Sequence, residues 1–577
     1  MTVLQRDIAD LPNLATTPGR AGPVRSRKPV YVDLLPPCNN ACPAGENCQE
    51  WLRLAKLEQP KTAWQQLVRD NPMPSIHGRV CYHPCETACN RGDLDAPIAI
   101  HAVERYLGDM ATAQGWQFDL PRNRTGYKVL VVGAGPAGLS CAYHLARAGH
   151  AVTIVDAGQQ AGGMLRYGIP EYRLPRDVVD AEIARIEALG VQIVTGHRVD
   201  DLLAEKRDGG YDAVFVGVGA GRGRHIDIPS MDATRMLDAV DFLKDTASGD
   251  AEPGRIKRPL LGRKVAVYGA GNTAMDAART AQRLGAEEAI IVYRRTEAQM
   301  PAHEDEMHEA QREGVKMNWL RTIKEQEGAD LTVEIMELDD QGRSVPTGKF
   351  EKLSADTLIL AVGQDAETGF LRNVPGLNFD GDTIKVDPST MMTDVPGIFA
   401  GGDAVPSDRT VTISVGHGKK AARHIDLWLR RADADPRVKH PLIEFGGLNL
   451  WFFGNNPRGQ QPELDLAARE TGFEEIVAGL TPDEAIYEAT RCLSCGNCIE
   501  CDGCLGACPE NAVIKLGPGH RYRFDYDRCT GCRACAEQCP VCAIVMVDED
   551  SSPRPAARFL PPEAITDVQS GVRSNPA

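Results

Sequence analysis

Short apolar runs that lead into glycine-rich turns recur in the middle of the chain and predict parallel strands. Residues 129–132 are apolar, a glycine-rich turn follows at 133–138, and residues 139–146 have the apolar spacing of a helix. A second apolar run at 151–155 ends in Asp156. This order predicts a dinucleotide-binding unit, in which the turn and the helix N-terminus bind a pyrophosphate and the acid binds a ribose hydroxyl. The expected turn residues are Gly133, Gly135, Pro136, Ala137 and Gly138.

The same pattern returns at 264–293 with one change at its end. An apolar run at 264–268 leads into a second glycine turn, and the next apolar run, 289–293, ends in two arginines instead of an acid. A basic pair at this place favours the 2′-phosphate of NADP, which an acid would repel. The alternative is an exposed pair that caps a helix. The residues of this expected site are Gly269, Gly271, Asn272, Thr273, Ala274, Arg294 and Arg295.

Helical spacing of apolar residues marks the N-terminal part of the chain. Residues 46–57, 61–69 and 98–110 predict three helices of an all-helical module. Near the other end, Thr481 and Glu484 have capping-box spacing with a proline between them, which predicts a helix that runs into Arg491. Residues 316–353, polar and alternating, predict a small β excursion.

Composition places the chain among large proteins of ordinary polarity. Its 577 residues suffice for several domains with cores of their own, and 42% hydrophobic with 25% charged residues fits that class. The net charge of −16 argues against a nucleic-acid partner, because phosphate binding needs a basic surface. No apolar run could span a bilayer and no signal-peptide pattern is present, so we expect no membrane contact. The cysteine arrays of the chain favour a reducing cytoplasm as the location.

Cysteines provide the strongest chemical signal. There are 18, and all but Cys141 lie at 38–89 or 492–542, which in a large unsecreted enzyme indicates metal binding rather than disulfides. Two C-x2-C-x2-C-x3-C-P arrays near the end have the spacing of bacterial two-cluster ferredoxins, in which each fourth cysteine binds the other cluster. One [4Fe–4S] cluster is therefore expected on Cys498, Cys501, Cys504 and Cys539. The other is expected on Cys529, Cys532, Cys535 and Cys508.

Five further cysteines predict a metal site near the N-terminus. They are Cys38, Cys42, Cys81, Cys85 and Cys89. The last three stand at four-residue steps and a proline follows Cys42, which favours iron–sulfur clusters over zinc, the alternative. Three nearby histidines are expected to be ordinary polar residues rather than ligands: His77, His83 and His101.

Further glycine-rich segments carry a resemblance to known flavoproteins. An apolar run ends in Gly363, a second run ends in Gly402 and Asp403, and residues 410–418 follow. This set resembles the FAD-binding half of flavoproteins with two dinucleotide-binding domains. The resemblance implies that Asp403 contacts the ribityl-phosphate side of the flavin. It also implies that the segment with Thr412 caps the isoalloxazine ring.

Residues 162–170 and 172–175 narrow this resemblance. They are similar to the glutamate synthase small-subunit family, which includes the N-terminal half of dihydropyrimidine dehydrogenase. The resemblance covers roughly residues 31 to 430 and adds three expected cofactor contacts, Gly163, Leu165 and Arg173.

The same resemblance implies where the N-terminal cysteines find their partners. In that family an R-C-x-x-C-G segment precedes the C-x3-C-P segment, whereas here it stands at 491–496, ahead of the ferredoxin array. We therefore expect this displaced segment to fold back, so that Cys492 and Cys495 join Cys38 and Cys89 in one cluster. A second cluster would use Cys42, Cys81, Cys85 and the non-cysteine ligand Glu104. The alternative is a single N-terminal cluster, with Cys492 and Cys495 idle.

These expectations combine into an α/β fold class with added modules. Two Rossmann-like dinucleotide-binding domains, for FAD and NADPH, are expected between an N-terminal all-helical Fe–S domain and a C-terminal α+β ferredoxin domain with two [4Fe–4S] clusters. The expected boundaries are a disordered tail at 1–30, the helical domain at 31–121, the FAD domain at 122–222 and 356–435, the NADPH domain at 223–355, a connector at 436–491, the ferredoxin domain at 492–549 and a second disordered tail at 550–577.

Such a chain is expected to be an oxidoreductase. Hydride transfer moves two electrons and clusters move one, so flavin lies between NADPH and the clusters. No general acid or base stands out, and no catalytic side chain is expected. The expected partner is a ferredoxin or another enzyme subunit within a hetero-oligomer. The fused ferredoxin module favours a 2-oxoacid oxidoreductase as that partner over a glutamate synthase large subunit. A non-enzymatic relay or assembly subunit is the alternative of another class.

Overall fold

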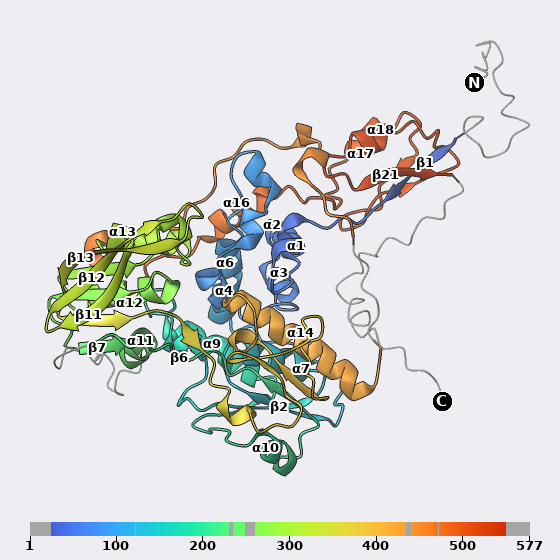
Figure 1. The fold of residues 1–577 in the computed structure, drawn as a ribbon. Helices are drawn as coiled ribbons and strands as arrows, with labels where there is room; N and C mark the ends of the chain where they lie inside the picture. The colour runs from blue at the N-terminus through green and yellow to red at the C-terminus, as the bar shows by residue number, and fades with distance from the viewer. Residues whose placement is uncertain are drawn as a thin grey trace, which may run out of the picture.

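The structure is a computed structural model that describes residues 25–121, 123–229, 235–247, 260–433, 440–470 and 472–549. The tails expected at 1–30 and 550–577 lie outside these residues, apart from 25–30. In Figure 1 the blue helices of the N-terminal module occupy the centre, between the two sheet-containing domains and the red C-terminal module. Within the described ranges, no helix combines the length and apolar character needed to cross a bilayer.

Short helices build the N-terminal module around two buried tryptophans, Trp51 and Trp64. The predicted helices are present, together with three shorter ones. They are α1 (Pro37–Ala41), α2 (Cys48–Lys56), α3 (Pro60–Leu67), α4 (Pro74–Val80), α5 (Pro84–Thr87) and α6 (Ile100–Ala113). Helices α4 and α6 touch backbone to backbone, because a Cβ at Gly78 would lie 2.4 Å from the Cβ of Arg105. This close packing brings the loops that carry the cysteines together.

The first nucleotide-binding domain is a parallel five-stranded sheet in the order β18-β5-β2-β3-β4. Its strands are β2 (Lys128–Val132), β3 (Ala151–Val155), β4 (Gln192–Val194), β5 (Ala213–Val216) and β18 (Ile398–Ala400). Helices α7 (Pro136–Arg147), α8 (Met164–Tyr167), α9 (Arg176–Glu187), α10 (Leu202–Asp208) and α14 (Val411–Arg430) accompany it. The central strands are buried on both faces, as expected for apolar runs in a parallel sheet.

The second nucleotide-binding domain is another parallel sheet, in the order β10-β9-β8-β14-β7. Its strands are β7 (Arg235–Asp238), β8 (Lys264–Tyr268), β9 (Glu288–Tyr293), β10 (Lys316–Trp319) and β14 (Thr357–Leu360), with helices α11 (Ala239–Ala247), α12 (Asn272–Arg283) and α13 (Glu304–Arg312). The predicted β excursion is an antiparallel sheet of β11 (Arg321–Glu327), β12 (Asp330–Leu338) and β13 (Ser344–Ser354).

The expected return to the first domain at residue 356 is wrong. Strand β14 pairs with β8 and β7 in the second sheet, and the chain rejoins the first sheet only at β18, where Phe399 pairs with Phe215. The apolar run of β14 suits a buried parallel strand in either sheet, so its sequence alone could not choose between them. The two domains are joined by a crossing pair, β6 (Arg222–Gly223) against β15 (Gln364–Asp365).

The C-terminal module includes a strand from the other end of the chain. Strand β1 (Arg27–Tyr31) pairs antiparallel with β21 (Ile544–Asp548), as the blue arrow beside the red module shows in Figure 1. The expected end of the N-terminal tail at residue 30 is therefore too late. Tyr31 stacks on Phe524 with ring centroids 5.1 Å apart. The module also contains α17 (Gly503–Ala507), α18 (Ala534–Glu537), β19 (Val513–Ile514) and β20 (Arg523–Phe524).

The connector fastens the C-terminal module to the helical one through α16 (Pro482–Arg491). Thr481 and Glu484 form the predicted capping box at its start. At its end Arg491 is buried and pairs with Glu488 and Asp95. Helix α16 thus delivers Cys492 to the N-terminal module.

A buried ion network locks the two nucleotide-binding domains together. Arg173, in the loop before α9, donates to both oxygens of Asp276 on α12 at 2.8 and 2.9 Å and to Glu306 on α13. Arg279 and Arg283 continue the network toward α13, and both guanidinium groups lie over the ring of Tyr172. Arg173 therefore links the two domains, and the cofactor contact that the resemblance implied for it stays a prediction.

Replacing Arg173 with methionine should loosen this lock. The change removes the cation that pairs with both Asp276 and Glu306 and leaves Arg279, 3.8 Å from Glu306, as the cation nearby. Removing one partner of a buried pair costs about 3 to 5 kcal/mol. Hydrogen exchange of α12 and α13 should accelerate accordingly. The control Arg198→Met removes an exposed pair with Glu367. It should change the free energy of opening that is derived from the exchange rates by less than about 1 kcal/mol. Wild-type exchange rates in R173M would contradict the lock.

Candidate functional site

The first glycine turn, residues 133–138, and the N-terminus of α7 form a concave site lined by backbone atoms, here called the first cradle. Gly135 is the N-cap of α7, and no side chain caps the helix there. A Cβ at Gly135 would meet nothing nearer than the Cα of Gly163 at 4.0 Å, whereas a Cβ at Gly163 would lie 2.8 Å from the Cα of Gly135. Two glycine segments thus face each other across the uncapped N-terminus of a helix. This shape and polarity fit a dinucleotide pyrophosphate.

Other residues of the turn fix its shape. A Cβ at Gly138 would lie 1.9 Å from the carbonyl oxygen of Gly133, so only glycine permits this close packing. Asp156, at the end of β3, accepts hydrogen bonds from the backbone N–H of Ala134 at 2.6 Å and of Gly158 at 2.7 Å. Its carboxylate is therefore held beside the turn, as the strand–acid pattern predicted. Pro136 and Ala137 open α7, and Leu165 is fully buried on α8.

The segment with Asp403 forms the second wall of this cradle. Gly402 and Asp403 lie in a 3₁₀ turn (Gly402–Ala404) just before α14, and the hydroxyl of Ser414 donates to Asp403 at 3.4 Å. Burial raises the pKa of the Asp403 carboxyl. Burial also lowers the pKa of His417 to about 4, so this imidazole is neutral and its Nδ1 accepts from the N–H of Gly402 at 3.2 Å.

The second glycine turn offers a similar cradle at the start of α12. Gly271 is its N-cap, and a Cβ there would meet nothing within 4 Å. Asn272 accepts from the N–H of His303, and Thr273 accepts from Gln364 at 3.2 Å. Ala274 is buried where the first turn has a glycine, and Gly269 has a left-handed φ of +133°. Gly363 lies at the crossing between domains, where its carbonyl accepts from the N–H of Arg224.

Arg294 and Arg295 follow β9 at the edge of this cradle. Both are exposed, and no carboxylate pairs with either among the residues that the structure describes. The hydroxyl of Ser344, on the β excursion, donates to the carbonyl of Arg294 and fixes the backbone there. Two cations without an acid partner fit the phosphate that distinguishes NADP.

All 18 cysteines are free thiols, and the structure gathers most of them into groups. The first cysteine group joins the two ends of the chain: Cys38, Cys89, Cys492 and Cys495. Burial and the neighbouring thiolate of Cys38 raise the pKa of Cys492 to about 11, and burial with Cys38 and Cys492 raises that of Cys89 to about 12. The amide of Asn90 donates to the sulfur of Cys495 at 3.5 Å. The displaced segment at 491–496 therefore lies against the N-terminal module.

The second cysteine group surrounds a buried carboxylate: Cys42, Cys81, Cys85 and Glu104. Burial and the charge of Glu104 raise the pKa of Cys81. Burial also raises the pKa of Glu104, and Cys42 and Cys85 add to the effect. These groups repel one another in their charged forms, so together they fit a cationic iron–sulfur core, which displaces thiol protons on binding.

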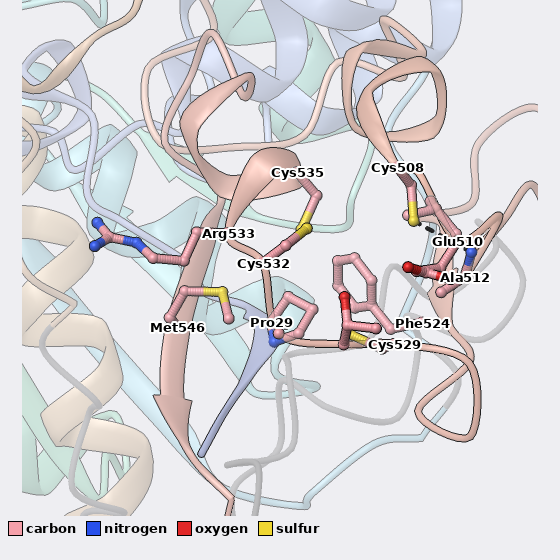
Figure 2. Close-up of a pocket in the computed structure, with 13 residues that line it drawn as sticks. Pro29, Cys508, Glu510, Ala512, Phe524, Cys529, Cys532, Arg533, Cys535 and Met546 are labelled. Carbon is pink, nitrogen blue, oxygen red and sulfur yellow. Dashed lines mark hydrogen bonds between the residues drawn. The ribbon is translucent and has the colours of Figure 1, made fainter. Parts of the chain in front are cut away.

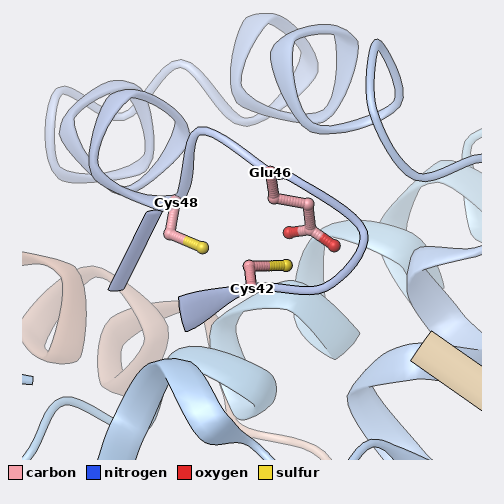
Figure 3. A group of neighbouring side chains, drawn as sticks. All are labelled: Cys42, Glu46 and Cys48. Carbon is pink, nitrogen blue, oxygen red and sulfur yellow. The ribbon is translucent and has the colours of Figure 1, made fainter. Parts of the chain in front are cut away.

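Sequence reasoning missed two residues in this region, Glu46 and Cys48. The sulfurs of Cys42 and Cys48 and a carboxylate oxygen of Glu46 lie within 4.8 Å of one another (Figure 3). Hydrogen bonding to Cys38, Cys42 and Cys85 raises the pKa of Cys48, so its thiol touches both groups. The available signal was position, because Cys48 begins α2 directly after the Cys42 loop. The sequence analysis assigned Cys48 to neither N-terminal cluster.

The three histidines of the N-terminal module all have polar neighbours. His77 is fully buried, which lowers its pKa to about 3, and lies between Glu46 and Glu104 with Nδ1 to oxygen distances of 3.9 and 3.8 Å. His83 and His101 stack with ring centroids 3.7 Å apart. His101 hydrogen-bonds to Glu86 at 2.7 Å and to Gln461 at 2.8 Å. The Nε2 atoms of His77 and His83 are buried without a hydrogen-bond partner among the described residues.

The C-terminal module holds two more groups in the crossed arrangement that the spacing predicted. In the third group, burial and the charges of Cys498, Cys501 and Cys539 raise the pKa of Cys504 to about 12. In the fourth, burial and the charges of Cys529, Cys532 and Cys508 raise the pKa of Cys535 to about 11. These last four cysteines line one pocket (Figure 2). Cys532 is exposed, which places the fourth group at the surface.

The fold and these sites define a class of protein. It is an oxidoreductase with two dinucleotide-binding sites, one after the other along the chain, and an iron–sulfur domain at each end. Its cofactors are FAD, NADPH and [4Fe–4S] clusters.

Comparison with known families identifies the chain more closely. It belongs to the pyridine nucleotide-disulphide oxidoreductase family, whose profile matches residues 127–424. The profile of dihydropyrimidine dehydrogenase domain II, with a 4Fe-4S cluster, matches residues 34–116, and that of the 4Fe-4S dicluster domain matches residues 497–543. The resemblance found in the sequence is thereby confirmed.

Three relatives share most of the chain. The NADP(+)-dependent formate dehydrogenase subunit beta of Moorella thermoacetica is 36% identical over 80% of this chain and 70% of its own length. The NADPH-Fe(3+) oxidoreductase subunit beta of Geobacter sulfurreducens is 32% identical over 81% and 77%. The NAD-dependent dihydropyrimidine dehydrogenase subunit PreT of Escherichia coli is 34% identical over 69% and 92%.

Iron analysis can test the proposal that Cys492 and Cys495 are ligands. Four [4Fe–4S] clusters hold about 16 iron atoms per chain. The double variant Cys492→Ser with Cys495→Ser should lose one cluster and retain about 12. Cys141→Ala is the matched control, because Cys141 is fully buried on α7 and burial alone raises its pKa. A double variant with full iron content would show that these two cysteines are not ligands.

Proposed function

We propose that this chain carries electrons between NADPH and the redox centre of a partner subunit, along four cysteine groups arranged in series. NADPH is held by the second domain and FAD by the first. When bound, FAD supplies the exchange between hydride and single electrons. The side chains of the protein bind, orient and insulate these groups, and none of them is needed as a general acid or base.

The observation that carries this proposal is a series of neighbouring sites that leads from the first cradle to the C-terminal module, joined by side-chain contacts or by a short stretch of chain. The hydroxyl of Thr412, on α14 beside the first cradle, donates to Cys81 of the second group at 3.0 Å. Cys48 contacts Cys85 of the second group and Cys38 of the first. Cys495 of the first group stands three residues before Cys498 of the third.

The line continues through the C-terminal module to the surface. The third and fourth groups are neighbours, because each takes one cysteine from the array of the other. Cys539 and Cys535 belong to the same array, but Cys539 lies in the third group and Cys535 in the fourth. The exposed Cys532 belongs to the fourth group. Electron exchange with another protein is therefore proposed to occur at this end of the line.

The relatives support a subunit role. All three are named as subunits, two of them of NADP-linked enzymes. We therefore propose that the partner is a catalytic subunit with its own redox centre, rather than an enzyme of one particular substrate. A 2-oxoacid oxidoreductase and a glutamate synthase large subunit remain two proposals of this kind.

The fourth group can be tested as the exit by removing one of its ligands. Cys532→Ala should leave NADPH-driven bleaching of the flavin at the wild-type rate. Reduction of an added two-cluster ferredoxin should fall at least tenfold, because the line is cut at its outer end. A small dye that accepts electrons at the flavin is the control and should be reduced normally. Wild-type rates with ferredoxin would contradict exit through this group.

Arg294 and Arg295 are proposed to select NADPH over NADH. Each charge-assisted contact with the 2′-phosphate contributes roughly 1.5 to 3 kcal/mol, about tenfold to a hundredfold in binding. Arg294→Ala combined with Arg295→Ala should raise the KM for NADPH by at least tenfold and leave that for NADH within about twofold. Arg343→Ala is a suitable control, because this exposed arginine of the β excursion is already paired with Asp339. Equal effects on both nucleotides would rule out the assignment.

A further inference from the structure

Helix α14 is a wall shared by the first nucleotide cradle and the second cysteine group. On one face, a Cβ at Gly418 would lie 2.2 Å from the carbonyl oxygen of Ala137, which belongs to the glycine turn. On another, a Cβ at Gly416 would lie 2.2 Å from the carbonyl oxygen of Pro43, the residue after Cys42. The helix therefore contacts both sites backbone to backbone, and it fixes their spacing.

Thr412 stands at the cradle end of this wall. It lies in the first turn of α14, two residues after the N-cap Thr410, and is 4% exposed. Its hydroxyl donates to the sulfur of Cys81, in the N-terminal module, at 3.0 Å. It is the one hydrogen bond between a side chain of the first domain and a sulfur of the second group that is found in the described part of the chain.

We propose that Thr412 is a positioning residue for electron entry, and that its hydroxyl tunes the second cysteine group through the sulfur of Cys81. This inference rests on the proposed function, because it requires the second group to hold a cluster. The residue acts on a ligand rather than on the flavin. It thereby adds a role to the cofactor contact that the sequence predicted for this position.

The physical argument concerns the charge that arrives with each electron. One electron that leaves the reduced flavin adds one negative charge to the cluster, and much of that charge is shared by the cysteine sulfurs. An O–H donor aimed at a sulfur stabilises the reduced form, and hydrogen bonds to the sulfurs are among the factors that set cluster potentials. At a buried position this stabilisation is stronger than it would be in water. The hydroxyl therefore raises the midpoint potential of the cluster that accepts electrons first.

Two substitutions separate the hydroxyl from the shape of the side chain. Thr412→Val keeps the branched shape and removes the donor, whereas Thr412→Ser keeps the donor. Ser140→Ala is the matched control, because this fully buried hydroxyl also contacts α14, through the carbonyl of Val415, but reaches no sulfur. All variants are prepared as the full chain with FAD and clusters in place.

The main measurement is a redox titration followed by electron paramagnetic resonance. The signal of the second group is identified as the one that disappears in Cys81→Ser. In T412V its midpoint potential should fall, while T412S and S140A keep the wild-type value. FAD and iron contents of T412V should equal those of the wild type. After mixing with NADPH, electron transfer from the flavin to the clusters should slow severalfold relative to flavin reduction in the same sample.

The other outcomes overturn the inference. A wild-type potential for this signal in T412V would show that the hydroxyl does not tune the group. Loss of FAD or iron in T412V, or an equal shift in S140A, would show that the residue acts through folding or cofactor retention. Failure of the proposed function is distinguishable, because the wild-type protein itself would then lack the signal that Cys81→Ser removes.

Discussion

Mutual repulsion among buried thiolates is the constraint on which this structure depends. The thiols of the first group raise one another's pKa because each negative charge lies beside another in a space that excludes water. Neutral donors such as the amide of Asn90 at Cys495 and the N–H of Ser494 at Cys492 offset only part of this repulsion, so the thiols keep their raised pKa values. A cationic iron–sulfur core, bound as we propose, would remove the repulsion by using all four sulfurs as ligands. Because two of those ligands come from each end of the chain, the same core would hold the terminal modules together.

The elements that sequence reasoning predicted are those whose signals are local. The glycine turns, the capping box at Thr481 and the cysteine arrays each lie within a dozen residues and depend on rules of spacing. The crossed grouping in the C-terminal module was also predictable, because the array spacing belongs to one known arrangement. The meeting of Cys492 and Cys38 was predicted from a resemblance, and the structure places these thiols together.

The elements that the sequence could not reveal depend on contacts between distant segments. Strand β14 has an apolar run that fits either sheet, and only its pairing with β8 shows that it belongs to the second one. Strand β1 is five residues long and gains its partner, β21, from the far end of the chain. Arg173 matched a family segment, but its carboxylate partners come from two helices of the other domain. Cys48 was missed because its place between the first and second cysteine groups depends on how the loops fold, which its position in the sequence does not reveal.

The contact between the two ends of the chain also determines when during synthesis each cysteine group can be completed. Asn90 and Cys495, which meet in the structure, are separated by 405 residues. At ribosomal rates of about 5 to 20 residues per second, roughly 20 to 80 seconds pass between their synthesis. The second cysteine group is complete by Glu104, so it could receive iron while the rest of the chain is still being made. The first group stays incomplete until Cys492 and Cys495 have been made, and Cys38 and Cys89 can meanwhile react with oxidants or bind other metals. Assembly of this group therefore requires that Cys38 and Cys89 be protected until synthesis of the chain is nearly finished.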